Sequence, residues 1–144
     1  MFTRILFGTD FTHEAIEAEK EVADLAVSIG ASVVALHAIE PIDPGGDQAP
    51  FEEFYASLKA AAEEKLTAVA RRLADRRITC DIKVTIGPRW KEIVEQAVEE
   101  SADLIVLGSR PRGEPLSAGS TGHKVFWTSE VPIMFVRRTR SPEP

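Results

Sequence analysis

The chain has 144 residues, the size of a single domain with room for a substantial core. Its net charge of −6 argues against duplex nucleic acid or an anionic membrane as the main partner, and its 44% hydrophobic content is typical of globular proteins. A single cysteine, Cys80, excludes an internal disulfide and a cysteine-rich metal site. The N-terminal residues lack the apolar run of a signal peptide or membrane span, so we expect a cytoplasmic protein.

Short apolar runs alternate with amphipathic stretches along the chain. The apolar runs predict five strands, at residues 5–8, 33–39, 78–86, 104–107 and 133–136. Apolar residues at helical spacing predict helices at residues 12–29, 51–73 and 88–98, and a further helix that opens at 119–122. Continuous apolar strands separated by helices indicate a parallel sheet covered on both faces, so we expect an α/β fold.

Several element ends carry local signals. Thr12 is a favoured N-cap residue, and Gly30 stands where a helix would stop. The second helix is expected to bury one apolar face, made of Phe51, Phe54, Leu58, Ala62, Leu66, Val69 and Leu73. We expect one domain over residues 1–137 and a disordered tail over 138–144, which holds no apolar residue.

The most informative stretch for function is 101–137. An apolar strand runs into Gly108, and Gly119-Ser120-Thr121-Gly122 follows at the start of a helix. Glycines let backbone N–H groups turn toward a ligand, and a helix start adds unpaired donors with partial positive charge. This combination predicts a phosphate site, although neither G-x-x-x-x-G-K-[ST] nor G-x-G-x-x-G occurs. The turn at Thr9-Asp10 also ends a strand, so it is expected to face the same crevice as Gly108.

Three segments carry a family resemblance. They are Gly8-Thr9-Asp10-Phe11, the run from Leu36 to Pro41, and the run from Asp103 to Arg110. Together with the closing Val131-Pro132-Ile133-Met134-Phe135-Val136-Arg137, they make the chain from about Arg4 to Arg137 resemble the universal stress protein family.

The resemblance implies a three-layer α/β/α fold with a five-stranded, mostly parallel sheet, Rossmann-like and similar to the adenine nucleotide alpha hydrolases. It also implies a homodimer paired through the last strand, Ile133 to Val136, and, in some members, bound ATP with Mg²⁺. By resemblance, Asp10 lies near the adenine or ribose, Ala38 lines the base pocket, and Leu107 lies beneath the sugar with Gly108. The full candidate set is Gly8, Thr9, Asp10, Ala38, Leu107, Gly108, Ser109, Arg110, Gly119, Ser120 and Thr121.

The phosphate loop departs from the family pattern. ATP-binding members carry G-x2-G-x9-G-[ST]; here Gly108 and Gly119-Ser120 match the ends, but Pro111 replaces the second glycine and the loop is two residues shorter. Proline has no N–H to offer a phosphate. Gly113 is a candidate replacement, and Arg110 is a nearby source of positive charge.

Three functions remain open at this point. The first is a cytoplasmic stress-response protein that binds ATP as a regulatory ligand, with at most slow hydrolysis, because no nucleophile with an identifiable base stands out. The second is a family homodimer that has lost nucleotide binding and acts as a protein-interaction module. The third is a group-transferring enzyme, which the absence of HIGH-type and SGG-type motifs disfavours. Ordinary structural roles also remain open: turn formation for Asp10, sheet core for Ala38, and capping for Ser109, Ser120 and Thr121.

Overall fold

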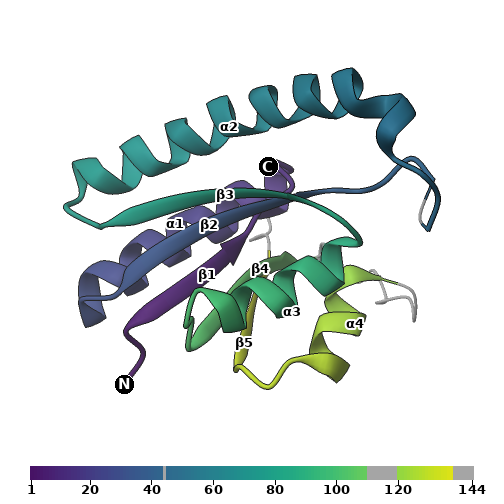
Figure 1. Cartoon of the computed structure of the whole chain (residues 1–144). Helices are drawn as coiled ribbons and strands as arrows, with labels where there is room; N and C mark the ends of the chain where they lie inside the picture. The colour runs from purple at the N-terminus through teal and green to yellow at the C-terminus, as the bar shows by residue number, and fades with distance from the viewer. Residues whose placement is uncertain (44, 110–119, 138–144) are drawn as a thin grey trace, which may run out of the picture.

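The computed structural model describes residues 1–43, 45–109 and 120–137. Five strands form one parallel sheet in the order β3-β2-β1-β4-β5. The strands are β1 (Arg4–Gly8), β2 (Ser32–Ile39), β3 (Cys80–Ile86), β4 (Leu104–Ser109) and β5 (Ile133–Arg137). Figure 1 shows helices on both faces of this sheet, so the predicted three-layer α/β/α fold is confirmed. No helix in the described ranges is both long and apolar enough to span a bilayer.

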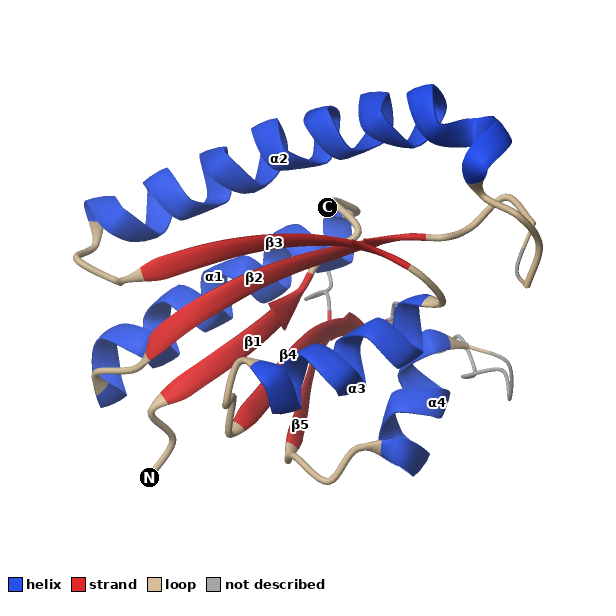
Figure 2. Cartoon of the chain, in the orientation of Figure 1, coloured by secondary structure: helices blue, strands red, loops and turns tan. Residues whose placement is uncertain are grey.

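Each face of the sheet has its own apolar core. Helices α1 (His13–Ile29) and α2 (Glu52–Asp75) cover one face, and α3 (Arg89–Glu99) and α4 (Thr121–Thr128) cover the other (Figure 2). Ile5 and Phe7 of β1 point into the first core and Leu6 points into the second, and all three are fully buried. The central strand is therefore apolar on both faces, as parallel sheets require.

The local signals at the ends of α1 work as the sequence predicts. Thr12 is the N-cap, and its side-chain oxygen accepts a hydrogen bond from Ala15 N at 3.4 Å. Gly30 adopts the left-handed conformation (φ 72°), and its N–H donates to Ala26 O at 2.8 Å. A 3₁₀ turn, η1 (Ala49–Phe51), precedes α2.

Two expectations for the middle of the chain need correction. On the face of α2 expected to be buried, Phe54 is 50% exposed and Leu58 is 38% exposed, whereas Tyr55, next to Phe54, is 5% exposed. Tyr55 is buried because its hydroxyl is satisfied there: it donates to Gln48 Oε1 at 2.6 Å and accepts from Ile42 N at 2.8 Å. The third strand begins at Cys80 rather than at residue 78, because Ile78 N still donates to a carbonyl of α2.

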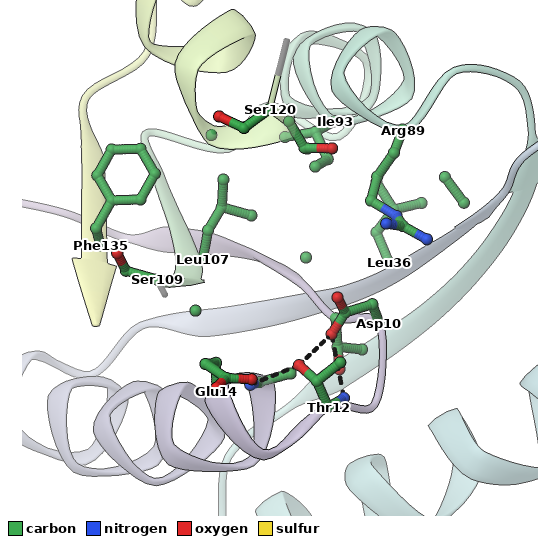
Figure 3. Close-up of a pocket in the computed structure, with 17 residues that line it drawn as sticks. Asp10, Thr12, Glu14, Leu36, Arg89, Ile93, Leu107, Ser109, Ser120 and Phe135 are labelled. Carbon is green, nitrogen blue, oxygen red and sulfur yellow. Dashed lines mark hydrogen bonds between the residues drawn. The ribbon is translucent and has the colours of Figure 1, made fainter. Parts of the chain in front are cut away.

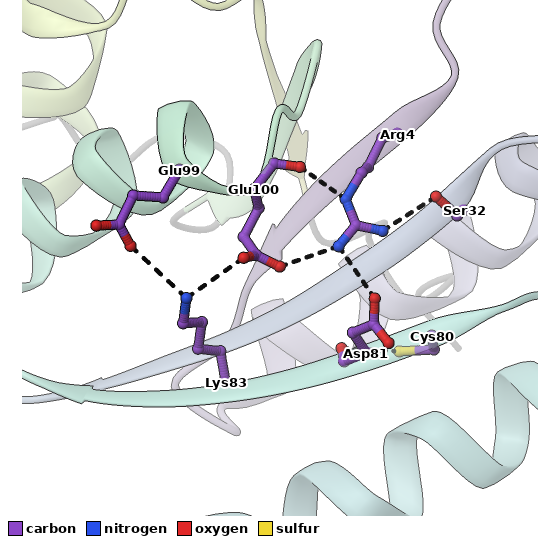
Figure 4. A network of polar contacts seen from close by, with 7 residues as sticks. All are labelled: Arg4, Ser32, Cys80, Asp81, Lys83, Glu99 and Glu100. Carbon is purple, nitrogen blue, oxygen red and sulfur yellow. Dashed lines mark hydrogen bonds and ion pairs between the residues drawn. The ribbon is translucent and has the colours of Figure 1, made fainter.

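A polar network holds the opposite end of the sheet from the carboxyl ends of the strands (Figure 4). Arg4 Nε donates to Glu100 O at 2.8 Å, and its Nη2 contacts Glu100 Oε1 at 3.0 Å and Asp81 Oδ2 at 3.1 Å. Its Nη1 donates to Ser32 Oγ at 3.2 Å, and Lys83 Nζ lies 3.3 Å from Glu100. One guanidinium thus joins β1, β2, β3 and the end of α3.

Candidate functional site

A cavity of about 570 Å³ opens at the carboxyl ends of the central strands (Figure 3). It sits at the point between β1 and β4 where the strand order reverses, with β2 and β3 on one side and β5 on the other, which is the usual ligand position in such sheets. The described residues that line it are Gly8, Thr9, Asp10, Thr12, Glu14, Ala15, Leu36, Ala38, Arg89, Ile93, Leu107, Gly108, Ser109, Ser120, Thr121, Gly122 and Phe135.

The turn after β1 places Asp10 at the cavity. Thr9 N donates to Leu36 O at 2.9 Å, which continues the pairing of β1 with β2 beyond the end of β1. Asp10 Oδ1 accepts from Thr12 N at 3.1 Å and from Thr12 Oγ1 at 2.6 Å. One carboxylate oxygen therefore fixes the turn. Within the described residues Oδ2 has no such hydrogen bond, which leaves it as an acceptor for a ligand.

The same turn contains a strained residue. Phe11 has φ 64°, in the left-handed region that favours glycine. Its ring lies 4.7 Å from the ring of His37, and Lys65 Nζ lies 5.0 Å from its centre. His37 Nδ1 in turn donates to Thr9 O at 2.9 Å. The His37 ring is thus hydrogen-bonded to the turn, and together these contacts hold the strained turn in place.

Gly108 lets β4 approach the first turn of α1. A Cβ at this position would lie 2.6 Å from Glu14 C, 2.7 Å from Glu14 O and 2.9 Å from Ala15 N. These are backbone atoms and cannot rotate away. Packing against α1 is therefore sufficient to explain a glycine here, beside any role in binding phosphate.

The start of α4 forms another part of the cavity wall. Ser120 is the N-cap, and its hydroxyl accepts a hydrogen bond from His123 N at 3.2 Å. Thr121 and Gly122 are the first two helical residues, whose N–H groups have no acceptor within a helix. Ser120 also lines the cavity, so it caps α4 at a position next to any bound ligand.

Another part of the lining is apolar. It is made of Leu36, Ala38, Ile93, Leu107 and Phe135, drawn from β2, α3, β4 and β5. An apolar wall combined with a few polar groups is the usual character of a small-molecule pocket, and the volume falls within the common range of roughly 300–1,000 Å³.

Comparison with known proteins decides the family. The model of the universal stress protein family matches residues 1–137. The chain belongs to this family. A universal stress protein of Thermus aquaticus is 32% identical over 95% of this chain and all of that protein. The solved structure of MJ0577 from Methanocaldococcus jannaschii, which is named a universal stress protein, is 26% identical and covers 98% of this chain and 99% of that one, with a TM-score of 0.81.

A further solved structure shares the fold with bound ligand. The universal stress protein of Archaeoglobus fulgidus, in complex with dAMP, covers 95% of this chain and 98% of that one, with a TM-score of 0.66 and 17% identity. At 17% identity, this similarity shows that the two proteins share a fold.

In this universal stress protein, nine of the eleven candidate residues line the cavity described above. They are Gly8, Thr9, Asp10, Ala38, Leu107, Gly108, Ser109, Ser120 and Thr121. Arg110 and Gly119 lie outside the described residues, as does Pro111. The sequence reasoning missed Arg89, Ile93 and Phe135, because each reaches the cavity through long-range packing rather than through a motif.

Cys80 and three aromatic side chains of α4 in this universal stress protein are not among the described residues that line the cavity. Cys80 is half-buried, and burial raises the pKa of its thiol to about 11, so the unreactive thiol form dominates at neutral pH. His123 Nε2 accepts a hydrogen bond from Trp127 Nε1 at 3.0 Å. Trp127 is 71% exposed and Phe126 is 61% exposed, so both aromatic rings lie on the surface of α4.

Proposed function

We propose that this universal stress protein is a cytoplasmic stress-response protein that binds an adenine nucleotide, ATP, as a regulatory ligand. The observation that carries the proposal is a single cavity that joins an apolar wall to the start of α4. The Archaeoglobus relative with bound dAMP supports it, because the same fold there accommodates an adenine nucleotide.

The lining suggests how the nucleotide would lie. The base fits against the apolar wall near Ala38, with Asp10 beside the base or ribose. The phosphates fit at Ser120, Thr121 and Gly122, where unpaired backbone donors and the helix dipole favour negative charge. Mg²⁺ bound with ATP would be held mostly by phosphate oxygens and water, and it would neutralise phosphate charge there.

Regulation would follow from a difference in affinity. A ligand shifts a protein between two states only by the difference between its affinities for them. The cavity is built from the turn after β1 and from the start of α4, and α4 carries the exposed Phe126 and Trp127. Nucleotide binding at the start of α4 would thus act on an element that also presents a surface for partners.

Charge at the helix start provides the direct test. Aspartate and asparagine are both good N-caps, so Ser120→Asp and Ser120→Asn should preserve α4 and differ only in charge. We expect Ser120→Asp to weaken ATP binding by tenfold or more, about 1.4 kcal/mol, through repulsion of the phosphates. Ser120→Asn should bind within about threefold of wild type, and isothermal titration with ATP and Mg²⁺ measures both.

Equal affinities for the two variants would contradict the placement of the phosphates. Failure of the wild-type protein to bind ATP below about millimolar concentration would instead favour the second function, an interaction module without nucleotide. Pro111 and the shortened loop are the sequence features that favour that alternative. Catalytic turnover faster than about one per second would support an enzyme.

We further propose that two copies pair through β5. This strand is at the edge of the sheet, and its Met134 is 39% exposed. An uncovered edge strand offers backbone groups to a second chain. Met134→Lys should shift the protein toward monomer in sedimentation velocity at micromolar concentration, whereas Val98→Lys, at a residue of α3 that is 65% exposed, should not. A monomeric wild type, or an unaffected Met134→Lys variant, would refute the pairing.

A further inference from the structure

Arg89 is the one cation among the described residues that line the cavity. Its Nε is buried and has no hydrogen-bond partner in the described part of the structure. Asp10 and Glu14 line the same cavity, yet neither forms an ion pair with Arg89 within the described ranges. A guanidinium carries five N–H donors, and within the described residues none of those of Arg89 has a hydrogen-bond or ion-pair partner, although buried donors are normally paired. Because Nε has almost no exposed surface, a ligand in the cavity would meet the guanidinium through Nη1 and Nη2.

The backbone fixes Arg89 on the β2 side of the cavity. Arg89 is the first residue of α3, and its N–H donates at 3.1 Å to Oε1 of Glu40, the residue that follows β2. Figure 3 shows Arg89 and Asp10 on the same side of the cavity, with Ser109 and Phe135 on the other. Arg89 thus lies on the side of the cavity lined by Leu36 of β2, the strand that also carries Ala38, and away from Ser109 and Phe135.

Arg89 and Asp10 offer opposite hydrogen-bonding groups. The guanidinium only donates, and the ionised Asp10 carboxylate only accepts. Adenine carries an amino donor next to a ring-nitrogen acceptor on each of its two edges, so it matches such a pair in either orientation. Hypoxanthine has a carbonyl in place of the amino group, and in the same pose its oxygen would face the carboxylate.

Building on the proposed nucleotide binding, we propose that Arg89 is a specificity-determining residue: it donates to a ring nitrogen of the base while Asp10 accepts from the amino group, and together they select adenine. This assigns a role to a residue that no motif in the sequence marks. It also accounts for an arginine that has no acidic partner among the described residues, in a cavity that two carboxylates line.

The test compares three ligands by isothermal titration: ATP, ITP and inorganic tripolyphosphate, each with Mg²⁺. Wild type should prefer ATP over ITP by at least about tenfold. Arg89→Met keeps an apolar stem and removes the donors, so it should weaken ATP by about tenfold and reduce the preference over ITP to about threefold or less. Tripolyphosphate, which has no base, should bind wild type and variant equally.

The matched control is Lys91→Met. Lys91 is an exposed cation two residues further along α3, is not among the described residues lining the cavity, and gives the same change in net charge. It should leave all three affinities unchanged. Unchanged ATP binding by Arg89→Met, or equal losses of ATP and tripolyphosphate, would overturn the assignment of Arg89 to the base. A wild type that binds neither ATP nor tripolyphosphate would overturn the proposed function itself, and this inference with it.

Discussion

Replacing Gly108 with alanine is expected to lower the free energy of unfolding by about 3 kcal/mol. The new Cβ would lie within 2.9 Å of three backbone atoms of Glu14 and Ala15. Because these atoms belong to the first turn of α1, relief requires a shift of the helix or of β4. Urea denaturation followed by circular dichroism measures the loss.

Gly8→Ala is the matched control. Gly8 pairs with Leu107 in the adjacent strand, and its added Cβ would also meet an atom at 2.6 Å, Leu107 Cδ2. That atom is the end of a flexible side chain, which can move, so the cost should be smaller, about 1 kcal/mol. A Gly108→Ala variant as stable as Gly8→Ala would show that α1 and β4 adjust easily, contrary to the packing argument.

The contact at Gly108 also bears on the cavity. It brings the start of α1 against the end of β4, so that Glu14 and Ala15 join Gly108 in the lining. Gly108 therefore helps to shape the cavity by allowing β4 to pack closely against α1. The structure thus gives Gly108 a packing role that the loop pattern alone does not reveal.

The sequence predicts those features that short-range chemistry decides. Thr12 and Gly30 mark the ends of α1 because capping involves atoms a few residues apart. The shared position of Asp10 and Gly108 was predictable for a different reason: carboxyl ends of parallel strands meet at one edge of the sheet. The family resemblance, which the comparisons confirm, added candidate site residues such as Ala38 and Leu107.

The features that sequence reasoning missed depend on distant partners. Tyr55 replaces Phe54 in the core because its hydroxyl meets Gln48 and the backbone of Ile42, contacts that helical periodicity does not contain. Arg89 enters the cavity because Glu40, 49 residues earlier, accepts its backbone N–H. Its charge alone gave no signal, since most arginines lie on the surface.

Arg4→Met is expected to lower the free energy of unfolding by about 2 to 3 kcal/mol. The side chains of Arg4 and Glu100 are only 21% and 23% exposed, so solvent replaces their contacts poorly. Methionine keeps the apolar stem but leaves Glu100 O without its hydrogen bond from Nε and leaves Asp81 without its ion pair. Lys83 still faces the Glu100 carboxylate, which keeps the loss below that of a fully buried pair.

Lys20→Met provides the comparison for an exposed ion pair. Lys20 Nζ lies 3.7 Å from Glu17 Oε1 on the surface of α1. Exposed ion pairs of this kind contribute about 0 to 1 kcal/mol to the free energy of unfolding. Urea denaturation should therefore show little change for Lys20→Met and a clear shift of the midpoint for Arg4→Met. If the two variants were equally stable, the Arg4 network would be no more than surface charge. A larger loss of unfolding free energy for Arg4→Met would instead show that the Arg4 guanidinium links three strands and α3 at the end of the sheet remote from the cavity.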